Sequence, residues 1–226
     1  MGPELELADE FWLVAHDTVG GKPQLPPPTL GIGVAAALVA ELMIRRCVVL
    51  SQGRLRLLTA TLPDDPALAP LMSQMLAEDK QLRSTGVAHD PGSQSLRDWI
   101  AFLAAESRAA DLVAARLARA GVVERQERRK LTGRRSVTYV PKDSSTAGWP
   151  ASRISTAIRG GRYVDDLDLV LAGLMLATGL HQRALGQLEP HELRQLGQQM
   201  KTRMHDMLRE LIHHAEVAVG EIVMIR

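Results

Sequence analysis

The chain has 226 residues, and its 27 lysines and arginines nearly balance its 26 aspartates and glutamates, for a formal net charge of +1. Attraction to a polyanion therefore has to come from a local concentration of charge. Aromatic residues make up only 3% of the chain, which disfavours a binding site built on stacked bases or sugar rings. A chain of this length buries roughly 70% of the surface of its unfolded form, so we expect it to fold without a disulfide or a metal.

The N-terminus and the single cysteine indicate where the protein is located. Residues 2–6 are acidic and lack the basic and apolar regions of a signal peptide, so we expect a cytoplasmic protein. Cys47 is the only cysteine, which excludes an internal disulfide framework and favours a buried thiol in a reducing compartment. Two apolar stretches, residues 30–44 and 167–180, are shorter than the roughly 20 residues that a bilayer requires. We expect both to be core helices and predict no transmembrane segment.

The hydrophobic periodicity predicts mostly helices. Apolar residues over 5–14 predict a first helix that ends near the turn residues Gly20-Gly21. Ser93 or Ser95 is expected to cap the helix marked by apolar residues from 96 onward. A hairpin is predicted over residues 48–58, where Gly53 supplies the positive φ. The remaining helices are expected over residues 30–46, 67–80, 96–103, 109–120, 152–159, 166–180 and 192–216, with loops over residues 23–28, 85–93 and 142–150. This predicts a mainly α fold: a single globular helical domain over residues 1–226 with two short β-hairpins.

The second predicted hairpin concentrates positive charge. The helix before it ends at Gly121, and an alternating strand over residues 137–140 follows a predicted turn at Thr132-Gly133. The basic residues around this turn are Arg125, Arg128, Arg129, Lys130, Arg134 and Arg135, and the preceding helix adds Arg108, Arg116 and Arg119. A cationic hairpin tip is suited to contact polyanions, either the phosphates of DNA or the headgroups of an anionic membrane. The other interpretation is a cluster of arginines that only keeps an exposed hairpin soluble.

Patterns that support catalysis or metal binding are weak in this chain. The histidines of the predicted C-terminal helix lack the spacing and the third ligand of a zinc motif. Gly31-Ile32-Gly33 has no preceding strand and no following Lys-Ser/Thr, so we interpret it as permitting close packing of the proline-rich connector. The acid pairs at residues 64–65 and 165–166 precede predicted helices and are expected to cap them. We therefore expect no enzymatic activity, no cofactor and no metal site.

The order of these elements resembles the Golgi phosphoprotein 3 family, peripheral membrane proteins that bind phosphatidylinositol 4-phosphate and have relatives in actinobacteria. The resemblance covers nearly the whole chain. It rests on residues 5–13 with Asp17 and Gly20-Gly21, residues 34–42, residues 117–124, the hairpin over residues 128–141 and the helices from Arg153 onward. It implies a bacterial, actinobacterial member with an all-α fold and added hairpins, no catalysis, and a cationic face that meets a membrane.

In that family, the headgroup pocket uses a tryptophan before the second helix, an arginine at the start of that helix, and two arginines one turn apart on the helix before the hairpin. The matching positions here hold uncharged residues, namely Pro26, Ala35, Ser107 and Ala110. Arg108 is one residue out of register, an offset that turns a helical side chain by about 100°. The resemblance therefore implies a less specific contact with phosphatidylinositol 4-phosphate or a related anionic lipid, through Arg108, Arg128, Arg129, Lys130, Arg134 and Arg135.

Two other functions remain open. A winged-helix nucleic-acid binder would use the same parts, a helix, a short strand and a basic wing. The helix lacks the Asn and Gln that read bases, so no specific nucleic-acid partner is expected. An assembly protein would use the hairpin to contact partners, and a homo-oligomer is left open. Our first expectation is a non-enzymatic peripheral protein at the inner face of the membrane, where each basic side chain contributes on the order of 1 kcal/mol to binding anionic lipid.

Overall fold

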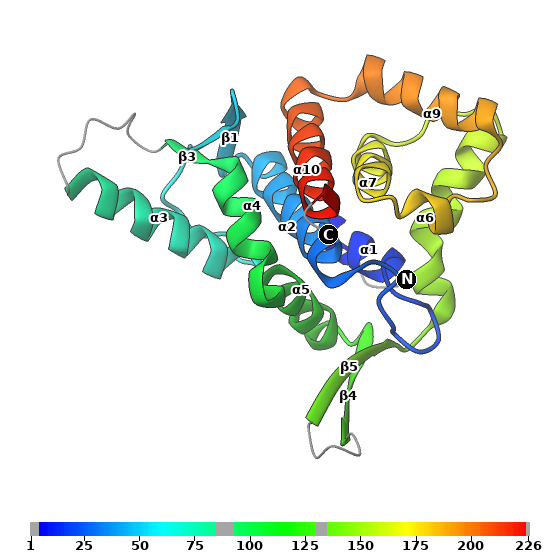
Figure 1. Ribbon diagram of the computed structural model, residues 1–226, viewed down its shortest axis with the longest axis horizontal. Helices are drawn as coiled ribbons and strands as arrows, with labels where there is room; N and C mark the ends of the chain where they lie inside the picture. The colour runs from blue at the N-terminus through cyan, green and yellow to red at the C-terminus, as the bar shows by residue number, and fades with distance from the viewer. Residues whose placement is uncertain (1–4, 85–92, 130–134, 225–226) are drawn as a thin grey trace.

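The structure, a computed structural model, describes residues 5–84, 93–129 and 135–224. Helices pack around the central helix α2 (Pro27–Ile44), and two small antiparallel sheets lie at the periphery (Figure 1). This confirms the predicted fold class. The other helices are α1 (Leu7–Val14), α3 (Leu68–Ser84), α4 (Leu96–Ala104), the 3-10 turn η1 (Ala105–Ser107), α5 (Arg108–Arg119), α6 (Ser144–Arg159), α7 (Asp166–Ala177), α8 (His181–Ala184), α9 (Pro190–Arg203) and α10 (Asp206–Met224). The strands are β1 (Val48–Ser51), β2 (Arg54–Leu57), β3 (Ser93–Ser95), β4 (Val123–Arg129) and β5 (Arg135–Pro141).

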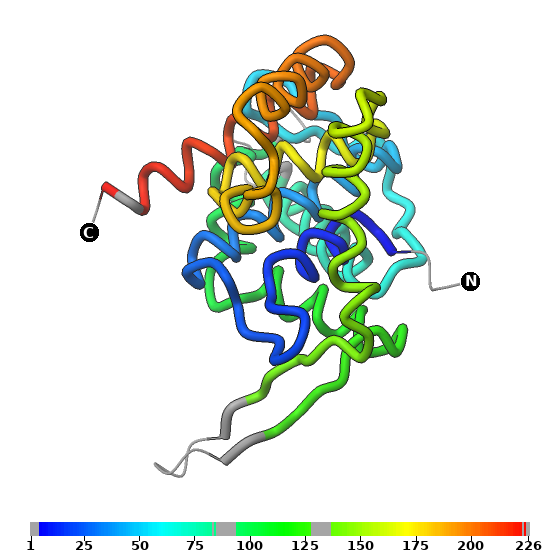
Figure 2. The backbone as a smooth tube through the Cα atoms, turned by 90° about the vertical axis from the view of Figure 1, so that its right-hand side faces the viewer, coloured from blue at the N-terminus to red at the C-terminus, as the bar shows by residue number. Residues whose placement is uncertain are grey.

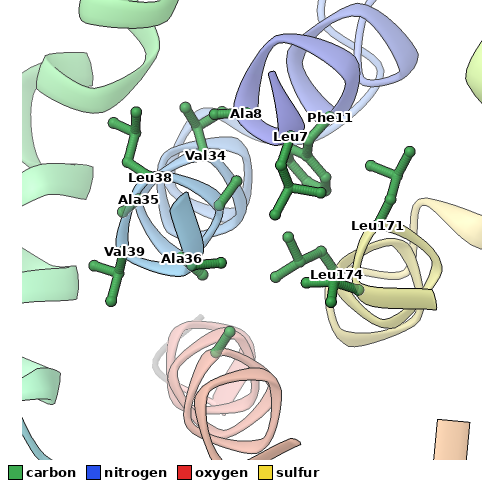
Figure 3. Close-up of a cluster of buried hydrophobic side chains, with 14 of the residues drawn as sticks. Leu7, Ala8, Phe11, Val34, Ala35, Ala36, Leu38, Val39, Leu171 and Leu174 are labelled. Carbon is green, nitrogen blue, oxygen red and sulfur yellow. The ribbon is translucent and has the colours of Figure 1, made fainter. Parts of the chain in front are cut away.

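Helix α2 is central because it is apolar on every side, and such a helix is stable in a globular protein only when neighbours cover it. Its residues 29–43 are buried, with α1, α4, α5, α7 and α10 packed around it. Figure 3 shows Phe11 of α1 and Leu174 of α7 beside this helix. By length and composition α2 could cross a membrane, but 83% of that stretch is buried inside the protein. It is a core helix, as predicted.

The start of α2 differs from the prediction. Pro27 and Pro28, assigned to the connector, are its first two residues, where a helix needs no backbone N–H donor. Gly31 and Gly33 lie inside the helix, within the range of residues 30–46 that was predicted as helical. A Cβ atom on Gly31 would collide with the carbonyl oxygen of Ala104, and one on Gly33 with the ring of Phe11. The expected role of these glycines in packing the connector is wrong, because they let α4 and α1 approach α2.

The first predicted hairpin is confirmed and is part of a larger sheet. β1 pairs with β2, and the turn between them places both Gln52 and Gly53 at positive φ. β2 also pairs with β3, which lies at the end of the predicted polar loop, so the hairpin is two strands of a three-stranded sheet. A strand of three residues is too short to show an alternating pattern. The Ser95 hydroxyl accepts a hydrogen bond from the Asp98 N–H, which confirms it as the cap of α4.

Two predictions in the C-terminal part are wrong. The expected loop over residues 142–150 is the first half of α6, because the Asp143 carboxylate accepts hydrogen bonds from the N–H groups of Ser145 and Thr146 and starts the helix there. The long helix expected over residues 192–216 is two helices, α9 and α10. The chain turns at Met204, whose backbone is extended, and His205 Nδ1 accepts a hydrogen bond from the Met207 N–H at the start of α10.

Gly33→Ala tests the close packing of α1 on α2. The added methyl group would collide with Phe11, and overpacking of this kind costs about 1–3 kcal/mol. We expect a lower Tm by thermal unfolding, with roughly 2–4 °C lost per kcal/mol in a chain of this size. Gly197→Ala on α9 is the matched control, since nothing lies within 4 Å of its Cβ position and alanine favours a helix. A Tm for Gly33→Ala equal to or above that of the control would contradict the packing.

Candidate functional site

The predicted basic hairpin is formed by β4 and β5, which project away from the helical body (Figures 1 and 2). Their antiparallel register runs from Val123 opposite Pro141 to Arg129 opposite Arg135. Arg128 and Arg129 end β4 and Arg135 begins β5, so the backbone brings these three candidate residues together at the far end of the described hairpin. The other two candidates on the hairpin, Lys130 and Arg134, lie outside the described residues.

The register divides the charged residues of the hairpin between two faces. Successive residues of a strand alternate between faces, and directly opposed residues share one. One face, which we call the basic face, holds Arg125, Glu127, Arg129 and Arg135. Arg128 lies on the other face, together with Glu124. By this register, three arginines and one glutamate are assigned to the basic face, and one arginine and one glutamate to the opposite face.

The base of the hairpin is fixed to α1 and to the turn that follows it. The ring of Tyr139 on β5 lies edge-on to Trp12, with centroids 6.4 Å apart, and Trp12 stacks on His16 at 3.7 Å. Burial lowers the pKa of His16 to about 4, so this ring is neutral at pH 7, and its Nδ1 lies 2.7 Å from the carbonyl oxygen of Trp12. Gly21, at positive φ, brings its backbone against the carbonyl of Tyr139. The hairpin is held at its base by packed aromatic groups.

Helix α5 contributes less positive charge to this site than predicted. Arg108 begins α5, whereas the hairpin follows its other end, about 16 Å away along a helix of this length. Its guanidinium is engaged locally, 2.9 Å from Glu106 and 4.5 Å above the ring of Phe102. Arg116 is 6% exposed and so cannot add to a cationic surface, which corrects its assignment to the basic segment. Of the three arginines on this helix, Arg119 is the one that is exposed and close to the hairpin.

The positions that match the family's headgroup pocket supply no positive charge. Pro26 precedes α2, and Ala35 is fully buried inside it. Ser107 precedes α5 at positive φ, and Ala110 is half-buried on its first turn. None of the four side chains carries a positive charge that could form an ion pair with a phosphate.

A buried ionic cluster, missed in the sequence, holds α5 in place. The Arg116 guanidinium donates to three carboxylates: its Nε lies 2.9 Å from Asp9 of α1, its Nη1 lies 2.9 Å from Glu41 of α2, and the same Nη1 lies 3.1 Å from Asp65 ahead of α3. All four side chains are less than 10% exposed. The signal in the sequence was an arginine between Val113 and Leu117 on the apolar face of α5.

Burial has the largest effect on how the carboxylates of the cluster titrate. Burial raises the pKa of Asp9 to about 6 and also raises the pKa of Glu41, against the opposing effect of Arg116. Burial acts in the same direction on Asp65, but the N–H groups of Leu68 and Ala67, with Arg116, hold its pKa below the usual value. Arg116 stays charged, since its carboxylate partners raise its pKa further. Asp9 therefore titrates within about one pH unit of neutrality.

Comparison with known proteins identifies the family. A sequence model described as Golgi phosphoprotein 3 matches residues 7–219, from the start of α1 into the second half of α10. The chain belongs to the Golgi phosphoprotein 3 family. No curated protein matches it in sequence. The matched region includes the hairpin and the buried cluster, and membership in a family of Golgi-associated, membrane-peripheral proteins agrees with the resemblance seen in the sequence. Within the described residues, no group of His, Cys, Asp and Glu side chains is arranged to hold a metal ion.

Arg116→Met tests whether the buried cluster stabilises the fold of this family member. The substitution removes the cation and leaves three buried carboxylates without it, so we expect a loss of about 3–5 kcal/mol in the free energy of unfolding. Urea denaturation followed by circular dichroism measures the loss. Arg119→Met, on the exposed side of the same helix, is the control and should change stability by less than about 0.5 kcal/mol. Similar losses for the two variants would contradict a role for the ion pairs.

The raised pKa of Asp9 predicts a specific dependence of stability on pH. Because the folded state holds this proton more tightly than the unfolded state, the stabilisation it gives is complete below pH 3.8 and is lost as the pH rises through about 6. Relative to Asp9→Asn, the wild type should gain about 1 kcal/mol between pH 7 and pH 5. Denaturation of both proteins at the two pH values measures this difference. Parallel pH profiles for the two proteins would show that Asp9 titrates normally.

Proposed function

We propose that this member of the Golgi phosphoprotein 3 family is a non-enzymatic peripheral membrane protein that binds anionic lipid headgroups through the basic face of its hairpin, acting as one domain over residues 1–226. The observation that carries the proposal is the register of β4 and β5, which gathers Arg125, Arg129 and Arg135 on one face against a single acid. Family membership supports a lipid as the partner. A cytoplasmic location at the inner face of the membrane is part of the proposal.

The expected binding is weak and sensitive to salt. Each basic side chain near an anionic leaflet contributes on the order of 1 kcal/mol, and this attraction decays within a Debye length of about 8 Å at physiological ionic strength. The charge of Arg125 is partly neutralised by an ion pair with Glu127, 2.6 Å away, and both side chains are half-exposed. Because Pro26, Ala35 and Ser107 offer no cation at the matched pocket, we propose that charge density, and not the position of the phosphate on an inositol ring, determines which membranes are bound.

Vesicle sedimentation with face-specific variants tests the proposal. Arg129→Glu reverses a charge on the basic face, and Arg128→Glu makes the same change at the adjacent residue on the opposite face. A reversal on the basic face removes about 2 kcal/mol of attraction, or roughly thirtyfold in affinity. We expect a much smaller effect for Arg128→Glu, because this variant changes the charge by the same amount on the face that the proposal turns away from the membrane. Equal partitioning of Arg129→Glu and wild type would contradict the proposal.

A second experiment tests which lipid the protein binds. Phosphatidylcholine vesicles that contain phosphatidylinositol, its 4-phosphate or cardiolipin are compared at equal surface charge. We expect similar binding to the three and loss of binding at high salt. Retardation of random duplex DNA by the wild type but not by Arg129→Glu, without vesicle binding, would instead favour the nucleic-acid function. Binding to neither partner would leave assembly as the role of the hairpin.

A further inference from the structure

A cavity lies at the opposite end of α5 from the hairpin. It opens where the start of α2, the end of α4, the turn η1 and the second half of α10 meet, and its volume is about 620 Å³. We call it the α2–α10 cavity. A volume of this size is in the range of sites that hold small-molecule ligands. Most of its lining is apolar and includes Pro27, Ile32, Ile100, Ala104, Ala218 and Ile222.

The charged side chains at this cavity are already paired. Arg97 and Glu221 face each other across its edge at 2.9 Å, and Glu106 lies 2.9 Å from Arg108. Among the described residues that line the cavity, Ser107 is the remaining polar side chain. A phosphate would have to compete for Arg97 with Glu221, and a peptide would bring backbone N–H and C=O groups that need partners. A hydrocarbon chain needs neither.

The wall of the cavity is formed by backbone in an unfavourable conformation. Glu106 and Ser107 both have positive φ, at 54° and 62°, although neither is a glycine. Two adjacent residues of this kind are uncommon, and such strain is concentrated where function requires a particular backbone path. Here the strain turns the chain between α4 and α5, so that the two helices do not continue as one. The bend leaves the exposed alanines Ala101 and Ala105 at the cavity.

The position of the cavity relates it to the hairpin. Figure 2 shows the end of α10 projecting to the left of the body and the hairpin projecting downward and to the left. Ala218 and Ile222 of this projecting helix line the cavity, and Val217 and Met224 nearby are exposed. An apolar helix end and a basic hairpin that both project from the body can each reach a membrane surface. The cavity lies along this projecting helix, through Ala218 and Ile222.

We propose that the α2–α10 cavity binds a hydrocarbon chain, and specifically an acyl chain of a membrane lipid. The inference rests on the proposed function only for the source of the chain. The cavity's neutral edge and apolar wall match a hydrocarbon whatever the hairpin contacts. The cavity adds a short-range apolar contact to the long-range attraction of the basic face, and it takes a chain of either anionic or zwitterionic lipid.

The test is photocrosslinking from anionic vesicles that contain a phosphatidylcholine with a diazirine at the end of one acyl chain, read by peptide mass spectrometry. We expect labels on α4, η1 and the second half of α10. Ala101→Phe and Ala105→Phe fill the cavity from exposed positions and should reduce this label, by roughly fourfold for each methylene group that they exclude. Ala77→Phe, an exposed alanine on α3, is the matched control. Unchanged labelling in both cavity variants, or labelling elsewhere, would overturn the proposal.

A second arm separates this inference from the proposed function. A phosphatidylcholine with short chains, used below its micelle concentration, should bind the wild type and Arg129→Glu equally and should bind Ala101→Phe less. Suppose that wild type and Arg129→Glu both bind the soluble lipid, but the wild type does not sediment with vesicles. Lipid binding by the cavity is then supported, and the proposal that the hairpin binds membranes fails. If vesicles bind but the soluble lipid does not, and crosslinking misses the cavity, the acyl-chain proposal fails alone. Binding of a free fatty acid without vesicle labelling would overturn the membrane lipid as the source.

Discussion

The buried guanidinium of Arg116 is the interaction on which the arrangement of the candidate site depends. A charge is tolerated in a protein interior only when it is paired and hydrogen-bonded. Arg116 meets this condition through carboxylates of α1, α2 and the segment before α3, and Asp65 also accepts the N–H groups of Ala67 and Leu68. Helix α5 is rich in alanine and offers few large side chains to its neighbours. Its ion pairs therefore fix its position in a way that its apolar contacts alone would not.

The hairpin depends on this position because it is continuous with α5 at one end and leads to α6 at the other. On the α6 side, Arg153 donates to Glu10 of α1 at 2.9 Å and also pairs with Asp168 of α7. Between these ends, Tyr139 packs against Trp12 of α1. Helix α1 thus contacts α5 and α6, the two helices that flank the hairpin, as well as the base of the hairpin itself. The base of the hairpin is therefore held in place by contacts within the fold.

Most features that depend on neighbouring residues could be predicted from the sequence, whereas those that depend on distant residues could not. The turn at Gly53, the cap at Ser95 and the basic hairpin follow from local patterns, and all three are present. The start of α6 was missed because Pro150 favoured a loop over the capping signal of Asp143. The partners of Arg116 lie 107, 75 and 51 residues away, so no spacing rule connects them. An arginine on an apolar helix face indicates that its side chain is buried, but only the fold shows which carboxylates pair with it.

On our proposals, two contacts of different range act on one rigid body. Attraction between the basic face and an anionic surface extends over a Debye length and has little stereochemical preference. Contact between an acyl chain and the α2–α10 cavity acts only at close approach, where the hairpin has already raised the local concentration of chains. The first contact brings the protein to any sufficiently anionic membrane. The second contact slows dissociation of the protein only where an acyl chain can leave the bilayer. Loosely packed membranes would therefore be preferred, a selectivity that the uncharged residues at the headgroup-pocket positions cannot provide.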